Sequence, residues 1–536
     1  MVKENKKPSF LMNVLTIIFA QIAVKLLGVV YRMVITNIDG FGDVGNGYYN
    51  FGYQIYTLLL AISSIGIPNA ISKLVSERCA LDDFKGAMRI FKTALALFSL
   101  IGAFFSVVMY FGAEFIATNI FDAPLSVYTI RALSPALIFV SVSSVIRGFF
   151  AGQQNMRATN RSQVLEQFLK CISSILIVLA LVGAKPEYMA AGATLATTIS
   201  TFLSCLYLFL FYKLNSKSLK EKISVAPPSK IKGNFFSISK IILLVSIPIS
   251  LSAIVASLNR VIDIMTVVRS VKVALAPQFT SETLLNSEAV RLSGILSKAD
   301  VLINLPLALN TAFSTVLVPT IAGALAVKDY KTATGKISFS LLISIVIALP
   351  CSAGYMVLAK PILELIYPNA SDGALLFSMV APTVFFSAMS QTIYGSLQGM
   401  GKIYIPALSV FLGGLAKIIL NLTLIPNPSI GIYGAPIGSI ACQSIAFFVS
   451  FYVLRKNLTF KLDFKKYFIK PLFSSALMGI CVYYIYEFTS QYLGKISTLL
   501  SIGLGVIIYF AAILKLKVFS EEELKSIPIV GRFIKN

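Results

Sequence analysis

The sequence predicts an all-α polytopic membrane protein, because it is strongly hydrophobic, poor in charge and built from regularly spaced apolar runs. Of its 536 residues, 57% are hydrophobic and only 13% are charged, whereas soluble domains carry roughly 25% charged residues. Apolar runs recur from Leu11 to Leu514 and leave no polar segment long enough for a separate soluble domain. The whole chain is therefore expected to form one membrane unit.

A helix needs about 20 mostly apolar residues to cross the hydrocarbon core of a bilayer. Windows of that length predict about fourteen transmembrane helices, near residues 9–35, 48–70, 90–112, 126–150, 163–183, 189–212, 238–262, 296–324, 337–359, 375–397, 405–424, 434–454, 467–488 and 496–515. The first run is too long for the apolar part of a typical signal peptide and lacks a convincing cleavage site. It is predicted to be a retained spanning helix.

The charges between the spans predict the orientation of the chain. Both terminal tails and the loops 71–92, 213–240 and 455–470 are rich in lysine and arginine, while the loops around Asp39 and Asp43, Glu114 and Asp122, and Pro426 to Gly431 have almost none. Because cytoplasmic loops carry the excess of basic residues, both termini are expected in the cytoplasm. The 46 basic residues against 23 acidic residues then reflect topology and anionic lipid headgroups, and no nucleic-acid partner is expected. One longer outward segment, 269–294, is expected to form an external connection or a short surface helix.

An internal repeat predicts two homologous halves. A G-x-x-x-G turn leads into a lysine-bearing helix twice at one constant offset, and slightly different offsets add further matches. The matched pairs are Gly148 with Gly395, Gly152 with Gly399, Lys170 with Lys417, Gly192 with Gly434, and Pro68 with Pro319. An even number of helices separates the paired helices, so the halves are expected to be parallel. The predicted organisation is two six-helix lobes, an N-lobe at 1–222 and a C-lobe at 223–456, followed by two further helices and a cytoplasmic tail at 457–536.

Histidine is absent from the chain, which excludes many catalytic and metal sites. Imidazole relays, Ser-His-Asp triads and histidine-ligated metals cannot form. The six cysteines are isolated and show no C-x-x-C or other metal-like spacing. No catalytic residue, resident metal or cofactor is predicted, and the chain is not expected to be an enzyme.

Cationic side chains lie inside several predicted spans, where a charge costs about 2.5 to 3.5 kcal/mol on insertion scales. Lys25, Lys170 and Lys417 sit well inside apolar runs, so a polar cavity explains them better than snorkelling to the headgroups. Arg32 lies seven residues after Lys25 and on nearly the same helix face. Such a cavity would attract an anion.

Arg147, Arg269 and Lys298 lie nearer the ends of their predicted spans. For these three, snorkelling to the lipid headgroups is an equal alternative to a role in the cavity. If they face the cavity, guanidinium groups suit the oxygens of a diphosphate because they bind in bidentate geometry.

Three acidic residues, Glu166, Asp263 and Asp300, lie in or near the spans. Glu166 is four residues before Lys170, so an intrahelical ion pair is its simplest explanation. Asp263 and Asp300 each have a basic residue two or three positions earlier, which allows local pairs too. The alternative is that these carboxylates couple transport to protons or Na+.

Five stretches of the chain carry a family resemblance. They are IRGFFAGQQNMRAT at 146–159 continuing to SQVLEQ at 162–167, KLLGVVYR at 25–32, IPNAISKLVSE at 67–77, TVVR at 266–269, and INLP at 303–306 running to Val318-Pro319. Together they resemble the stage V sporulation protein B and polysaccharide-biosynthesis group. That group includes MurJ-type lipid II flippases, within the multidrug/oligosaccharidyl-lipid/polysaccharide (MOP) exporter superfamily. The resemblance covers essentially the whole chain.

The resemblance implies two lobes around a central cavity, with the last two helices forming a groove for a lipid tail. It makes Arg32, Lys73, Arg147 and Arg269 candidates for contact with a sugar-diphosphate headgroup, and Lys25 fits the same motif. The implied function is translocation of undecaprenyl diphosphate-linked cell-wall saccharide, most simply lipid II, by alternating access. The expected location is the bacterial cytoplasmic membrane. The expected partners are membrane lipids and the cell-wall synthesis machinery, and transport is expected to be coupled to the membrane potential, H+ or Na+.

Several alternatives to a lipid II flippase stay open at this point. The substrate could be another lipid-linked polysaccharide unit. A MATE-type multidrug or cation antiporter of the same superfamily would favour acidic cavity residues, and a membrane glycosyltransferase would usually need large external loops with catalytic carboxylates. A scaffold for cell-wall synthesis is also compatible with the sequence.

Overall fold

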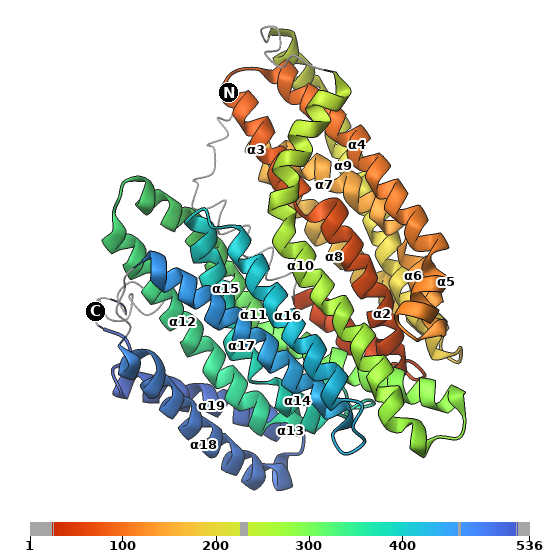
Figure 1. Ribbon diagram of the computed structural model, residues 1–536, viewed down its shortest axis with the longest axis vertical. Helices are drawn as coiled ribbons and strands as arrows, with labels where there is room; N and C mark the ends of the chain where they lie inside the picture. The colour runs from red at the N-terminus through yellow and green to blue at the C-terminus, as the bar shows by residue number, and fades with distance from the viewer. Residues whose placement is uncertain (1–23, 25, 226–233, 459–462, 521–522, 524–536) are drawn as a thin grey trace. The chain divides into compact units, whose positions relative to one another are not determined.

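The computed structural model describes residues 24, 26–225, 234–458, 463–520 and 523. Within these residues every regular element is a helix (Figure 1), which confirms the predicted all-α class. Thirteen helical stretches of the described chain are long and apolar enough to cross a membrane. They coincide in order with the second to fourteenth predicted spans, and the helix Leu26–Thr36 is the described part of the first.

The first compact unit comprises residues Met1–Gly294. After the helix Leu26–Thr36, its elements are α2 (Gly42–Leu60), η1 (Ala61–Ile65), α3 (Ile67–Ala80), α4 (Phe84–Phe111), α5 (Ala113–Phe115), η2 (Ile116–Ile120), η3 (Pro124–Ser126), α6 (Val127–Leu133), α7 (Ala136–Gly152), α8 (Met156–Ala180), α9 (Pro186–Val225), α10 (Phe235–Leu275) and η4 (Ala276–Gln278). A buried apolar cluster joins six of these helices, through side chains such as Ile71, Phe91, Phe149, Ala158, Leu208 and Ile242. In a bilayer, close van der Waals packing of this kind holds helices together.

The second compact unit comprises residues Ile295–Asn536. The long helix α11 (Glu282–Ala326) leads into it, followed by α12 (Tyr330–Val357), α13 (Ala359–Ile366), α14 (Ala374–Val380), α15 (Thr383–Gly399), α16 (Tyr404–Leu424), η5 (Gly431–Tyr433), α17 (Gly434–Asn457), η6 (Lys465–Ile469), α18 (Lys470–Leu493) and α19 (Ile496–Lys515). The two last helices, α18 and α19, pack against each other, and α18 also contacts α12.

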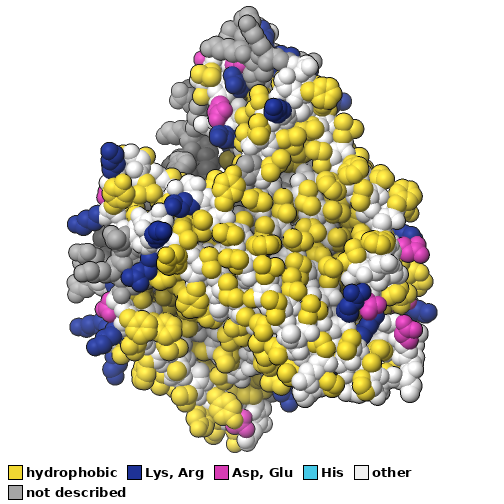
Figure 2. Space-filling model, in the orientation of Figure 1, with side chains coloured by type: hydrophobic (Ala, Val, Ile, Leu, Met, Phe, Trp, Pro, Cys, Tyr) yellow, Lys and Arg dark blue, Asp and Glu magenta, His cyan; other side chains and the backbone are white. Residues whose placement is uncertain are grey.

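The surface of the helices is largely apolar. Figure 2 shows a broad field of hydrophobic side chains on the visible face, with charged side chains mainly toward helix ends. On α4, for example, Leu100, Phe104 and Phe111 are exposed. Exposed side chains of this kind are expected where the solvent is lipid.

Glycine contacts support the predicted repeat. A Cβ atom on Gly148 of α7 would lie 2.8 Å from the carbonyl oxygen of Pro68, and one on Gly395 of α15 would lie 2.7 Å from that of Ser314. The contact recurs one turn later in both helices, at Gly152 on Ser72 and at Gly399 on Val318. Only glycine allows two backbones to approach so closely. By these contacts Pro68 corresponds to Ser314, so the predicted match of Pro68 with Pro319 is wrong.

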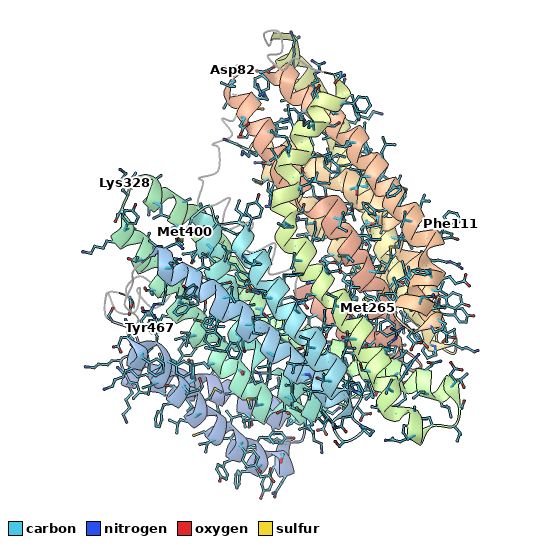
Figure 3. The ribbon with its side chains drawn as sticks, in the orientation of Figure 1. Asp82, Phe111, Met265, Lys328, Met400 and Tyr467 are labelled. Atoms are coloured by element: carbon cyan, nitrogen blue, oxygen red, sulfur yellow. The ribbon has the colours of Figure 1, made fainter. Side chains whose placement is uncertain are left out.

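The turns before α4 and α12 also match in geometry; Figure 3 labels one residue of each turn, Asp82 and Lys328. Both of these residues have a positive φ, of 55° and 58° respectively. In each case the next residue is an aspartate that caps the following helix, Asp83 accepting from the Gly86 amide (2.7 Å) and Asp329 from the Thr332 amide (3.0 Å). A residue with a positive φ followed by a helix-capping aspartate thus occurs once in each half.

The segment 269–294 is mainly helical, contrary to the expectation of a connection or a short surface helix. α10 continues to Leu275, and α11 begins at Glu282. An ion pair between Arg291 and Glu288, 2.8 Å apart and one turn from each other, stabilises the polar start of α11. Both helices therefore run beyond their apolar stretches.

The two compact units do not have the same boundaries as the predicted lobes, because the units are divided by contacts and the lobes are predicted from the internal repeat. α10 contacts α2, α3 and α4 and so belongs to the first unit, although the repeat predicts that it begins the second half. The predicted limits at 222 and 456 stay a prediction.

Candidate substrate-binding site

Two buried cations lie among tyrosine rings in the first unit. Arg32, in the helix Leu26–Thr36, is 6% exposed, and Lys170, in α8, is 5% exposed. The Arg32 guanidinium lies 4.0 Å from the ring centre of Tyr49. The Lys170 ammonium lies 4.5 Å from the ring centre of Tyr53 and 5.2 Å from that of Tyr31. We call these five residues the cation–tyrosine cluster.

The tyrosines of the cluster are linked to one another. The hydroxyl oxygens of Tyr31 and Tyr49 are 2.7 Å apart and share a hydrogen bond, and the rings of Tyr49 and Tyr53 stack with centres 5.6 Å apart. Positions four residues apart on α2 fall on one helix face, which brings both rings to the same side.

Two positive charges in one desolvated cluster favour an anion. A ring contact contributes about 0.5 to 2 kcal/mol to holding a cation, which offsets only part of the cost of a charge inside a membrane. Within the described residues, the contacts of Lys170 are with tyrosine rings and hydroxyls, and no carboxylate forms an ion pair with it. A bound anion would supply the missing negative charge.

Arg147 has a different environment, in the second half of α7 (Ala136–Gly152). Its Nη2 donates to Glu166 Oε2 of α8 (2.7 Å) and to Ser204 Oγ of α9 (3.0 Å), and its Nε donates to Ser162 Oγ of α8 (2.9 Å). The side chain is buried, so the snorkelling alternative does not apply to it. Arg147 thus joins three helices in a neutralised ion pair, and its predicted contact with a headgroup stays a prediction.

The ion pair of Glu166 is with Arg147 rather than with Lys170. The predicted intrahelical pair across one turn of α8 is therefore wrong in this structure, in which the carboxylate instead bonds across to α7. The predicted role of Glu166 in ion coupling stays a prediction. So do the roles of Asp263, half-buried on α10, and Asp300, exposed on α11.

The remaining predicted cations do not join the cation–tyrosine cluster. Lys73 on α3 and Arg269 on α10 are exposed, and Lys417 is buried on α16 in the second unit. A Cβ atom on Gly438 of α17 would lie 3.3 Å from the Lys417 side chain, so the two helices pack closely there. Lys25 lies outside the described residues.

Lys298 is buried and held by a loop of the second unit. Its ammonium donates to the backbone oxygens of Ala370 and Asp372 and lies 5.5 Å from the ring centre of Tyr367. Snorkelling therefore does not explain Lys298. In the described part of the chain, no group of three or more acidic or cysteine side chains is placed to hold a metal ion.

Sequence reasoning did not identify the tyrosines or the polar face of α2 beside them. Asn46, Asn50 and Gln54 recur every fourth residue of α2. Gln54 Nε2 donates to Asn50 Oδ1 (3.1 Å), and Arg260 Nε of α10 donates to Gln54 Oε1 (3.1 Å). The four-residue spacing of amides within an apolar run was the signal that could have revealed this face.

Comparison with known proteins decides the family. The family model described as polysaccharide biosynthesis protein matches residues 10–325, more than half of the chain. The chain belongs to this family. The model described as lipid II flippase MurJ matches residues 278–504, and the predicted resemblance is confirmed.

Two relatives from Bacillus subtilis (strain 168) match this family member over most of their length. Stage V sporulation protein B is 25% identical, over 98% of this chain and 99% of the relative. Lipid II flippase MurJ is 25% identical, over 85% of each chain.

Solved structures of two transporter types share the fold. A lipid II flippase MurJ in an inward closed conformation has a TM-score of 0.68 and 16% identity, covering 95% of this chain and 99% of that chain. An inward-facing multidrug resistance MATE family transporter of the MOP superfamily has a TM-score of 0.65 and 16% identity, covering 82% and 98%. At these identities the likeness establishes the fold alone.

Proposed function

We propose that this protein is a flippase that moves an undecaprenyl diphosphate-linked cell-wall saccharide, most simply lipid II, from the inner to the outer leaflet. The observation that carries the proposal is the cation–tyrosine cluster, which holds Arg32 and Lys170 together inside the membrane-spanning part of the first unit. The names of the relatives, a lipid II flippase among them, support it.

The chemistry of a lipid-linked diphosphate fits this cluster. Arg32 offers a planar fork of donors that matches phosphate oxygens, and Lys170 offers a compact second charge. The polyprenyl tail would stay in lipid while the headgroup enters the protein. An inward-negative potential then favours outward movement of the anion, by about 2.3 kcal/mol per charge per 100 mV.

Alternating access is the mechanism we propose, with both termini in the cytoplasm and the protein in the bacterial cytoplasmic membrane. The basic loops support that orientation. Protonation or Na+ binding at Glu166, Asp263 or Asp300 would couple transport to an ion gradient, and the cell-wall synthesis machinery would use the delivered saccharide.

The MATE-type fold raises export of organic cations as a second candidate. A site for cations would need uncompensated carboxylates inside the spans, whereas Glu166 is already paired with Arg147. The buried positive charges favour an anionic substrate instead. Among anionic substrates, the shared diphosphate makes other lipid-linked polysaccharide units the nearest alternatives to lipid II.

Complementation of a conditional lipid II flippase mutant tests the proposal. The unmodified chain is expected to restore growth, and Arg32→Ala is expected to fail although it is expressed and inserted. Arg147→Ala serves as a comparator for loss of a structural arginine. If the unmodified chain is inserted but does not restore growth, lipid II is not its substrate, while the broader flippase assignment stands.

A further inference from the structure

One face of α2 presents hydrogen-bonding groups that no other described residue satisfies. Asn50, Tyr53 and Gln54 are each partly exposed. Gln54 Nε2 donates to Asn50 Oδ1, and Gln54 Oε1 accepts from Arg260 and Thr57. Within the described residues, no hydrogen bond occupies the amide nitrogen of Asn50 or the hydroxyl of Tyr53.

This face lies on a helical stretch that is long and apolar enough to cross a membrane. Gln54 is twelve residues from the start of α2 at Gly42, which corresponds to about 18 Å along a helix, past the midpoint of a hydrocarbon core about 30 Å thick. Lipid cannot satisfy amide and hydroxyl groups there. The face therefore borders a space filled by water or by a polar ligand.

Asn46, one turn earlier on the same helix, is a useful contrast. It is 1% exposed, and its Nδ2 donates to Thr36 Oγ1 in the preceding helix (2.8 Å). An amide that only joins helices is buried against its partner in this way. Asn50 accepts a bond from Gln54 of its own helix, and its amide nitrogen has no partner among the described residues, so helix packing does not explain Asn50.

We propose that Asn50, Tyr53 and Gln54 form the subsite that recognises the sugar of the transported molecule, an inference that rests on the proposed flippase function. Sugar hydroxyl and acylamino groups both donate and accept hydrogen bonds, as do amide side chains. Aromatic rings complement the apolar faces of pyranose rings. Arg260, exposed on α10 and bonded to Gln54, fixes the orientation of that amide.

The position of Tyr53 supports the assignment, because Tyr53 belongs both to the cation–tyrosine cluster and to the proposed sugar subsite. The ring contacts the Lys170 ammonium at 4.5 Å, and its own helix carries Asn50 and Gln54. The proposed sugar subsite therefore adjoins the proposed diphosphate subsite. The same order, sugar next to diphosphate, occurs in the covalent structure of a lipid-linked saccharide.

The test compares two purified ligands on the full-length protein in nanodiscs, lipid II and undecaprenyl diphosphate, which lacks the sugar. Gln54→Leu and Asn50→Leu are each expected to weaken binding of lipid II about tenfold, as for loss of hydrogen bonds in a desolvated site. Both are expected to leave the affinity for undecaprenyl diphosphate unchanged. Gln391→Leu is the matched control, since Gln391 is a half-buried amide in a spanning helix of the second unit.

Each outcome of this test is decisive. A selective loss of lipid II affinity supports the sugar subsite. An equal loss for both ligands, or no loss for either, overturns it. If a leucine variant does not fold, Gln54→Asn or Asn50→Ala replaces it, and the same selectivity is expected. Failure of the unmodified protein to bind either ligand would instead refute the flippase function itself.

Discussion

The corner at Arg147 in the first unit and the corner at Tyr394 in the second unit share a backbone frame but differ in chemistry. Arg147 and Tyr394 each directly precede the first glycine of the repeated G-x-x-x-G turn, and each contacts a serine of the next long helix. Arg147 Nε donates to Ser162 Oγ (2.9 Å), whereas Ser409 Oγ donates to the Tyr394 hydroxyl (3.4 Å). The first corner adds a buried ion pair with Glu166.

This difference separates what the fold requires from what function adds. A neutral hydroxyl contact is sufficient to hold the corner of the second unit. The ion pair of the first unit therefore does more than maintain the turn. It pairs the Glu166 carboxylate, which lies one helical turn from Lys170, with Arg147 instead of with Lys170. Among the described residues no carboxylate pairs with Lys170, which agrees with the anion site proposed above.

The largest effect is expected from breaking the ion pair at the first corner. Glu166→Leu leaves the charge of Arg147 buried without its partner, which is expected to destabilise the protein by about 3 kcal/mol. Unfolding of the purified protein in mixed detergent micelles measures this. A change below about 1 kcal/mol, typical of surface pairs, would show that the pair is not structural.

A smaller loss of stability, equal in the two units, is expected when the repeated glycines are replaced. In Gly148→Ala and Gly395→Ala the new methyl group would lie 2.8 Å and 2.7 Å from a backbone oxygen, and each should destabilise by about 2 kcal/mol through overpacking. The same unfolding assay compares them. Clearly unequal values would contradict the structural equivalence of the two corners.

The smallest effect is expected at the second corner. Tyr394→Phe removes one hydroxyl contact with Ser409 and should destabilise by about 1 kcal/mol. Transport activity should be retained. If this variant lost as much stability as Glu166→Leu, the contrast between the corners would disappear.

Most of the fold could be predicted from the sequence, because membrane spans need long apolar windows and the chain contains them in clear succession. The unusual cations could be predicted for the same reason, since Lys170 and Arg32 interrupt apolar runs. Their partners could not. Glu166 lies four residues from Lys170, and nothing in the spacing reveals that it bonds to Arg147 on another helix.

The tyrosines were missed for a related reason. Tyrosine is common at membrane interfaces, so Tyr49 and Tyr53 carry no distinctive sequence signal until tertiary packing brings them to Arg32 and Lys170. The positive-φ turns before α4 and α12 were missed because Asp82 and Lys328 are ordinary polar loop residues in sequence. Their equivalence depends on backbone geometry.

Binding of undecaprenyl diphosphate to the purified full-length protein tests the central claim, that the buried cations of the first unit bind the anionic part of the substrate. Lys170→Met and Arg32→Gln are each expected to weaken binding at least about thirtyfold, as for loss of one member of a buried charge contact. Lys360→Met removes a lysine of the second unit whose side chain is 75% exposed and should bind as the unmodified protein does. Unchanged affinity in folded Lys170→Met and Arg32→Gln would contradict the account.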